Sequence, residues 1–200
     1  TTRPGQEFMS NNDCCFLFLT ERCNLACAHC YVNATPSRGS DMNLETAQSA
    51  LDLFGRLDIF DLRLTGGEPT IHPHFGSIIE LAAHRGFSIG LVSNGQRLIW
   101  RERDTDVFER LSRCWISVYG TTPEAHSTVA GYGSRPLWEI VNRVGALAGA
   151  GYPVGISVLV RPAELGGLID FVAKIAVAGV KRLRFLPLQN DGRGTTLPDA

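Results

Sequence analysis

The sequence reads TERCNLACAHCY from Thr20 to Tyr31, directly after the apolar run Cys14–Leu19. This stretch brings Cys23, Cys27 and Cys30 within eight residues, in a loop expected to leave a strand. Three thiolates at this spacing can bind one soft metal centre. A four-iron cluster held by only three thiolates keeps one iron open to a ligand that is not protein. The spacing therefore predicts a metal centre with one open position.

Two other interpretations of the same loop remain open. Offsets of four and seven residues also fall on one face of a helix, where three cysteines would be small core residues. Alternatively, the three cysteines and His29 could hold zinc in a zinc-stabilised binding module. His29 directly adjoins Cys30, however, whereas the ligands of structural zinc sites come in separated pairs.

Length and composition indicate one globular domain. No apolar stretch in the 200 residues approaches the length of a membrane span. The formal net charge is −1 and Lys and Arg form no block, which argues against nucleic acid or a membrane as a partner. Six cysteines, half of them in one loop, are typical of a reducing compartment. Because the N-terminus also lacks a signal-peptide pattern, we expect a cytoplasmic protein.

Apolar runs and helical periodicities alternate along the chain. Strands are expected over 14–19, 62–64, 87–92, 114–118, 154–160 and 182–186. Helices are expected over 44–57 and around 75–86, 107–111, 137–148 and 162–175. The last helix is expected to face the core with Leu165, Leu168, Ile169, Val172 and Ile175.

Six strands alternating with five helices predict an α/β fold with a parallel six-stranded sheet and right-handed connections. No linker or composition break divides the chain. We expect a lead-in over residues 1–12, a core domain over 13–188, and a Gly- and Pro-containing tail over 189–200. Because no helix is expected after the sixth strand, the tail is expected to lead into a C-terminal extension beyond Ala200.

Polar features follow the first four strands at the points where the strands end. The cysteine loop (residues 20–31) follows the first, the Gly-Gly turn (Gly66–Pro69) the second, Ser93 and Asn94 the third, and Ser117 ends the fourth. Ligands of parallel α/β folds collect at this edge. Glycines let backbone approach a ligand closely, Glu68 can accept from an ammonium group, and Pro69 fixes the exit of the turn. The alternatives are an ordinary turn with a solvated Glu and hydroxyls that cap local backbone.

The C-x3-C-x2-C spacing, the aromatic Tyr31 after it, and the Gly-Gly turn together resemble the radical S-adenosylmethionine (SAM) enzymes. This resemblance implies a partial (β/α)6 TIM-like barrel, open at one side. It also implies that Cys23, Cys27 and Cys30 bind a [4Fe-4S] cluster and that SAM is the second cofactor.

The resemblance further assigns contacts to SAM. The Gly66-Gly67-Glu68-Pro69 motif would hold the amino group of its methionine part, and the backbone of His29 would face the adenine. Ser93 and Ser117 match positions that reach the ribose or carboxylate, with Asn94 beside Ser93. Leu186, on the sixth strand, matches an apolar position against the adenine; its alternative role is simple core.

The implied activity is reductive cleavage of SAM to a 5′-deoxyadenosyl radical, which abstracts a hydrogen atom from the substrate. Ile116–Gly120, His126 and Gly192–Gly194 resemble the branch with a C-terminal SPASM or twitch extension. That branch implies a peptide substrate undergoing modification, with a tetrapyrrole or other small-molecule precursor as the second choice. A flavodoxin or ferredoxin is the implied reducing partner.

Overall fold

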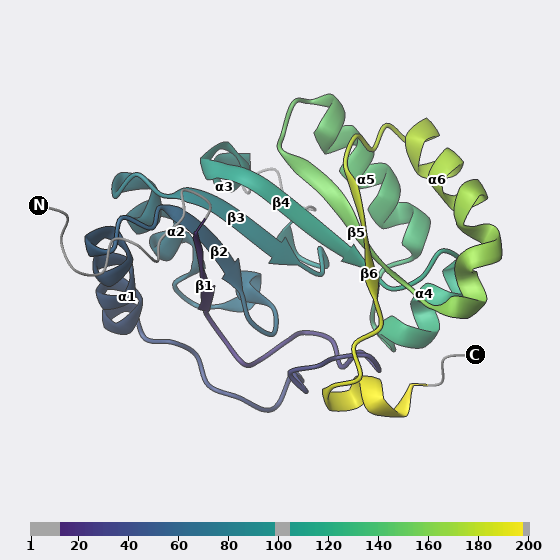
Figure 1. Ribbon diagram of the computed structural model, residues 1–200, viewed down its shortest axis with the longest axis horizontal. Coiled ribbons are helices and arrows are strands. Elements are labelled where there is room, and N and C mark those ends of the chain that lie inside the picture. Colours follow the sequence, from purple (N-terminus) through teal and green to yellow (C-terminus); the bar gives the residue numbers. More distant parts are fainter. Residues whose placement is uncertain (1–12, 99–104, 198–200) are drawn as a thin grey trace, which may run out of the picture.

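Six parallel strands form one sheet in the computed structural model, which describes residues 13–98 and 105–197. The expected lead-in, residues 1–12, lies outside the described residues. The strand order is β1-β2-β3-β4-β5-β6, so each strand pairs with its neighbours along the chain (Figure 1). The strands are β1 (Cys14–Phe18), β2 (Asp61–Thr65), β3 (Ser88–Ser93), β4 (Leu111–Val118), β5 (Val154–Val160) and β6 (Leu183–Pro187). The predicted parallel sheet is confirmed.

Helices connect successive strands and cover one side of the sheet (Figure 1). None of the helices in the described part is long and apolar enough to cross a membrane. The α-helices are α1 (Leu44–Arg56), α2 (Phe75–His84), α3 (Thr105–Arg110), α4 (Pro123–Ala130), α5 (Leu137–Gly149) and α6 (Leu168–Val177). The 3-10 helices are η2 (Pro69–Ile71), η5 (Pro162–Gly167) and η6 (Gly192–Thr196).

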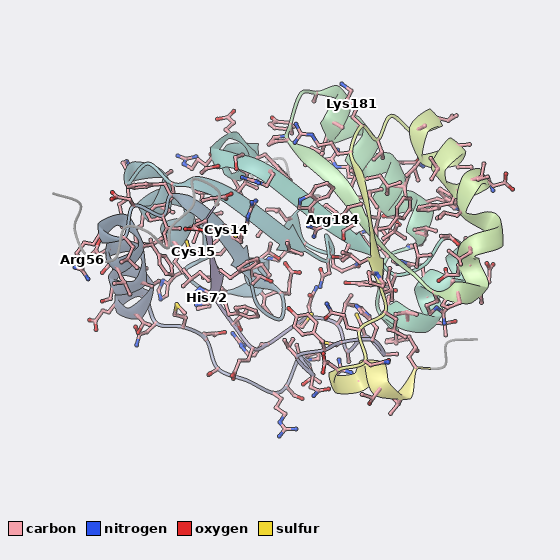
Figure 2. The ribbon with its side chains drawn as sticks, in the orientation of Figure 1. Cys14, Cys15, Arg56, His72, Lys181 and Arg184 are labelled. Carbon is pink, nitrogen blue, oxygen red and sulfur yellow. The ribbon has the colours of Figure 1, made fainter. Side chains whose placement is uncertain are left out.

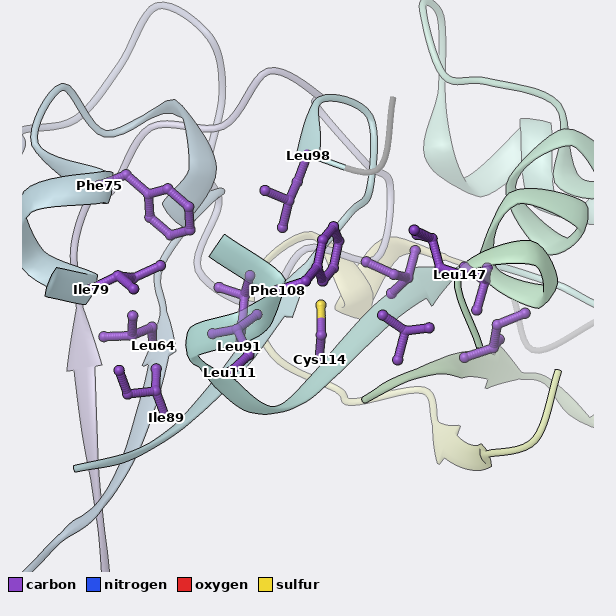
Figure 3. Close-up of a cluster of buried hydrophobic side chains, with 14 of the residues drawn as sticks. Leu64, Phe75, Ile79, Ile89, Leu91, Leu98, Phe108, Leu111, Cys114 and Leu147 are labelled. Atoms are coloured by element: carbon purple, nitrogen blue, oxygen red, sulfur yellow. The ribbon is translucent and has the colours of Figure 1, made fainter. Parts of the chain in front are cut away.

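The core lies between this helical layer and one face of the sheet. Burial alternates along β1, β2 and most of β4, and strand residues that face the helices, such as Leu64, Leu91 and Cys114, are almost fully buried. They pack against helix residues such as Ile79 and Phe108 (Figure 3). The opposite, inner face of the sheet carries polar and charged side chains at its centre. The fold therefore leaves one sheet face for contacts other than core packing.

The structure corrects the predicted core face of the last helix. Phe171 and Ile175 are buried on α6, whereas the expected core residues Leu165, Ile169 and Val172 are exposed. The segment before α6 forms the 3-10 helix η5, with three residues per turn, so an α-helical period extended back through it puts the wrong residues inward.

Two further elements were not expected from the sequence. One is α4, capped by the Thr122 side chain, which accepts from the Ala125 N–H at 3.2 Å. The other is η6, within the expected tail, which lies beside the cysteine loop. Both elements contribute to the site described below.

Candidate functional site

Ten of the twelve predicted site residues meet in one pocket at the carboxyl end of the sheet, called here the cysteine pocket. The predicted residues that line it are Cys23, Cys27, His29, Cys30, Gly66, Gly67, Glu68, Ser93, Asn94 and Ser117. A second pocket contains Leu186 and shares His29, Tyr31 and Ser117 with the first. Pro69 lies outside both linings and is buried as the first residue of η2.

Size alone does not mark this site. A hollow of about 640 Å³ lies between the cysteine loop and the segment around Arg38, and no cysteine lines it. It shares only Val32, Gly66 and Gly67 with the cysteine pocket. The chemistry of the side chains, rather than volume, distinguishes the cysteine pocket.

Backbone hydrogen bonds fix the cysteine loop at both ends. The Cys23 N–H donates to the Thr35 carbonyl at 3.1 Å, and the Ala28 N–H donates to the Val129 carbonyl of α4 at 2.8 Å. Within the loop, the Cys30 N–H donates to the Cys27 carbonyl at 3.2 Å. The cysteines therefore lie in an irregular loop, which excludes the interpretation as one face of a helix.

Cys23 and Cys27 are buried and Cys30 is half-buried, in a setting that favours a cationic partner. Burial raises the pKa of Cys27 to about 12 and that of Cys23 to about 11. The charges of neighbouring thiolates contribute to both of these increases in pKa. Backbone N–H groups nevertheless point at the sulfurs, from Leu25 to Cys23 at 3.4 Å and from Ala34 to Cys30 at 3.3 Å. Such donors stabilise thiolates, and a bound metal supplies the positive charge that deprotonates them.

The cysteines do not surround a single metal ion. Within residues 13–98 and 105–197, no three His, Cys, Asp or Glu side chains are grouped so that they could hold one ion. The zinc alternative, which needs its ligands to converge on one point, therefore has no support among the described residues.

The Gly-Gly turn packs directly against the cysteine loop. The Gly67 N–H donates to the Thr20 carbonyl at 2.7 Å, and the Glu68 N–H donates to the Arg22 carbonyl at 2.9 Å. A Cβ at Gly66 would overlap the Thr20 carbonyl, and one at Gly67 would overlap the Arg22 carbonyl. Gly66 also has a φ of +143°, which other residues rarely adopt. The glycines therefore permit close contact between the Gly-Gly turn and the cysteine loop. The N–H groups of Gly67 and Glu68 are already hydrogen-bonded within the protein.

The Glu68 carboxylate is a brace rather than an open acceptor. It is 1% exposed and accepts four hydrogen bonds. The Thr70 N–H and hydroxyl donate to Oε1 at 3.1 and 2.5 Å, the Ser93 hydroxyl donates to Oε1 at 2.8 Å, and the Asn94 N–H donates to Oε2 at 2.7 Å. The expected contact of Glu68 with an ammonium group stays a prediction. Burial raises its pKa, and these four donors oppose that shift.

The predicted residues after β3 are also engaged within the protein. Ser93 is buried, and its hydroxyl donates to Glu68 Oε1 and accepts from the Gly95 N–H at 3.0 Å. Its expected contact with the ribose or carboxylate of SAM stays a prediction. The Asn94 side-chain amide donates to Asn24 Oδ1 at 2.8 Å and to Cys23 Sγ at 3.5 Å. Asn94 is therefore a direct neighbour of a predicted cluster thiolate. Ser117 lines both pockets, and Leu186 is 43% exposed on the second rather than part of the core.

His29 and Tyr119 separate the two pockets from the protein interior. Their rings lie 4.8 Å apart, and the Tyr119 hydroxyl is hydrogen-bonded to the Cys27 thiol. Burial lowers the pKa of His29 to about 4, so its ring is neutral near pH 7. The buried His29 Nδ1 has no hydrogen-bond partner among the described residues. A bound group that donates to this nitrogen would satisfy it, which fits a second cofactor beside the thiols.

Arg193 is a site residue that sequence reasoning did not single out. It lies on η6, and its guanidinium donates to the Cys27 carbonyl and the Ala34 carbonyl, each at 2.9 Å. Its backbone N–H donates to the Cys30 carbonyl at 3.1 Å. The Gly192–Gly194 motif of this segment is visible in the sequence. Only the fold shows that Arg193 within it is hydrogen-bonded to the cysteine loop.

Comparison with known proteins gives the same picture. A family model described as the Radical SAM superfamily matches residues 17–171. The mycofactocin maturase MftC of Mycobacterium ulcerans is 32% identical over 182 aligned residues, covering 88% of this chain and 47% of that protein. The PqqA peptide cyclase of Ruegeria pomeroyi is 26% identical over 180 aligned residues, covering 88% of this chain and 47% of that protein. The chain thus spans about half the length of these curated relatives.

A solved structure shares the fold. Native anSMEcpe with bound AdoMet superposes with a TM-score of 0.71 at 18% sequence identity, covering 88% of this chain and 51% of that one. This likeness, with the six sequentially ordered parallel strands, confirms the partial (β/α)6 TIM-like barrel expected from the sequence.

Proposed function

The chain belongs to the radical SAM superfamily, whose enzymes use a [4Fe-4S] cluster and SAM, and from this premise we propose that Cys23, Cys27 and Cys30 bind the cluster. The observation that carries the proposal is the cysteine pocket, where the buried Cys23 and Cys27 and the half-buried Cys30 lie beside the Gly-Gly turn at the carboxyl end of the sheet.

The residues of the site have distinct tasks in this proposal. When bound, the cofactors supply one-electron cleavage of SAM, giving a 5′-deoxyadenosyl radical that takes a hydrogen atom from the substrate. Gly66 and Gly67 offer their carbonyl oxygens to the amino group of SAM, while Glu68 holds the turn in shape. Ser117 and Leu186 line the pocket for the nucleoside part. The buried Tyr119 and the half-buried His29 shield the thiols from water.

We further propose a peptide substrate, which the chain would modify after translation. The support is the similarity to a protein named a peptide cyclase and to one named a maturase. A small-molecule or tetrapyrrole precursor remains the second prediction. A flavodoxin or ferredoxin would deliver the electron, because the proposed cleavage of SAM consumes one. All six cysteines are unpaired, which agrees with a cytoplasmic location.

Anaerobic reconstitution tests the proposed chemistry. The chain is loaded with iron and sulfide, then given dithionite and SAM, and 5′-deoxyadenosine and methionine are quantified. We expect the wild type to form both, and Cys27→Ala to form neither and to lose most of its bound iron. Cys14→Ala is the matched control, since Cys14 is exposed on β1 and lines neither the cysteine pocket nor the second pocket. Normal SAM cleavage by Cys27→Ala would contradict the proposal.

A further inference from the structure

The inner face of the sheet carries more positive than negative charge at its centre. In each parallel pair, residues in register project to the same face, and Arg63 pairs with Gly90, which pairs with Arg113. Arg184 of β6 pairs with Ser157 of β5 on this face (Figure 2). Among the inner-facing residues of the six strands, the only charged side chains are Asp61, Arg63, Arg113 and Arg184. Three guanidinium groups therefore face one carboxylate.

Both carboxylate oxygens of Asp61 accept hydrogen bonds from two of these arginines. Asp61 accepts from Arg63 Nη2 at 2.7 Å and from Arg113 Nη2 at 3.1 and 3.2 Å. Gly90 lies between the two arginines, and a Cβ there would come within 2.9 Å of Arg63 and 3.1 Å of Arg113. The missing side chain at Gly90 thus leaves room for both arginines to lie across the sheet.

Arg184 is the cation without a counter-charge. Its Nε donates to the Ser157 hydroxyl at 3.0 Å, and its guanidinium carbon lies 4.6 Å from the centre of the Trp115 ring. No carboxylate in the described part of the chain forms an ion pair with it. Burial, followed by repulsion from Arg63, lowers its pKa. Trp115 and Ser157 hold the guanidinium in place while leaving its terminal nitrogens unpaired within the described residues.

This arginine adjoins the pocket assigned to the nucleoside part of SAM. Its partner Ser157 lines that pocket, together with Ser117 and Leu186, two residues along β6 from Arg184. A substrate lying along the inner face would meet Arg184 on one side and the pocket on the other. Guanidinium groups bind carboxylates through two parallel hydrogen bonds, and a partly buried setting strengthens them.

We propose that Arg184, on the same sheet face as Arg63 and Arg113, binds a carboxylate of the peptide substrate and so orients the peptide next to the cofactor pocket. This inference rests on the proposed function, because it names a feature of the same substrate. Two sources supply the required chemistry, an acidic side chain or the C-terminal carboxylate of the peptide, and the test separates them.

The test measures peptide binding to the reconstituted chain with SAM and without reductant, by titration calorimetry. One pair of probes is an acetylated, amidated alanine pentapeptide with a central Glu or a central Gln. The other is an acetylated alanine pentapeptide with a free or an amidated C-terminus. We expect one acid member to bind at least about tenfold more tightly than its neutral partner, a range reached by charge-assisted hydrogen bonds. The pair that discriminates identifies the source.

Variants locate the contact. Arg184→Gln should abolish the acid preference, and Arg184→Lys should recover only part of it, because Lys lacks the two-pronged geometry. Arg56→Gln, on an exposed turn of α1 far from the inner face, is the matched control and should keep the full preference (Figure 2).

Several outcomes would overturn the inference. Equal binding of acid and neutral peptides, no binding of either acid at millimolar concentration, or an acid preference that survives Arg184→Gln each contradicts it. Inorganic phosphate that binds as tightly as the acid peptides would point to a nucleotide-like anion instead. The wild-type formation of 5′-deoxyadenosine without peptide is measured separately, so failure of this inference is distinguishable from failure of the proposed function.

Discussion

Asn94 joins the end of β3 to a predicted cluster ligand through its side-chain amide, which donates to Cys23 Sγ at 3.5 Å. Hydrogen bonds to cluster sulfurs stabilise the thiolate and influence reduction potential. We expect Asn94→Leu to lower the affinity for the cluster about 10–100-fold, the range seen for groups that support metal ligands. Loss of the visible absorbance on titration with an iron chelator measures this. Asn142→Leu, on the exposed face of α5, should retain the cluster as the wild type does.

Glu68 is a second residue whose environment predicts the effect of a change. Two backbone N–H groups, from Thr70 and Asn94, meet its two carboxylate oxygens, and neither donor can turn away. In Glu68→Gln, the amide NH2 must face one of them. A buried unsatisfied donor costs about 1–3 kcal/mol, so we expect that loss in the free energy of unfolding by urea. Glu80→Gln, exposed on α2, should leave stability unchanged; an equal effect of both changes would contradict the proposed brace.

His126 should make the stability of the fold depend on pH. Its Nδ1 accepts from the Tyr119 N–H at 3.1 Å, its Nε2 lies 3.1 Å from the Arg135 carbonyl, and burial lowers its pKa. The unfolded chain therefore takes up a proton near the ordinary histidine pKa of about 6.5, before the folded chain does. Stability from this group is present above that pH and is lost as the pH falls below it. Urea unfolding between pH 7 and pH 5 should show a smaller loss in His126→Asn than in the wild type, whereas the exposed His84→Asn should match the wild type.

The chemistry at single positions was only partly predictable. The spacing of the cysteines and of Gly66–Pro69 was enough to predict which residues gather at the site. It could not reveal that Glu68 and Ser93 satisfy one another, because that hydrogen bond joins residues 25 positions apart. Nor could it reveal Arg193, whose partners are backbone carbonyls more than 150 positions away.

At the scale of elements, η6 holds the cysteine loop in place through the hydrogen bonds of Arg193, which we call the Arg193 clasp. Arg193→Ala removes two side-chain hydrogen bonds, each worth about 1 kcal/mol, from the carbonyls of Cys27 and Ala34. We expect amide hydrogen exchange over residues 27–34 to accelerate roughly tenfold or more, measured by mass spectrometry, because local opening becomes less costly. Arg56→Ala should leave this exchange unchanged. Unaltered protection in Arg193→Ala would show that the clasp is not needed to hold the loop.

The strands were predicted more reliably than the helices. Strands of a covered parallel sheet are continuous apolar runs, which are visible in sequence. The short helix α4 carries few buried residues, so its apolar pattern is weak. The sequence features that indicate it lie at its ends, namely the Thr122 cap, Pro123 in the first turn and Gly131 after the last turn. The 3-10 segment η5 displaced the core face of α6 from the expected residues, because its turns have a different period.

For the molecule as a whole, cofactor binding should stabilise the fold. A ligand that binds only the folded state at a hundredfold excess over its Kd adds about 2.7 kcal/mol. For a chain of this size, each kcal/mol shifts Tm by about 2–4 °C, so anaerobic reconstitution should raise Tm by roughly 5–10 °C. Differential scanning fluorimetry under argon measures this. Cys27→Ala should show no such rise; an equal rise would indicate stabilisation by iron bound elsewhere.

The sheet architecture followed from the alternation of strands and helices, and the comparisons confirm the family. The division into a core domain over 13–188 and an extension beyond Ala200 stays a prediction. The charges on the inner face were not anticipated. Arg63, Arg113 and Arg184 lie on three different strands, and only the register of the sheet brings them to one face.

The clasp of Arg193 on the cysteine loop also sets an order of events during biosynthesis. Its carbonyl partner at Cys27 lies 166 positions earlier in the chain. A ribosome adds roughly 5–20 residues per second, so the loop is made about ten to thirty seconds before the arginine that fastens it. Throughout that interval the nascent thiols are less restrained than in the finished protein. An assembly factor delivering iron and sulfide would therefore find them most open while translation is still under way.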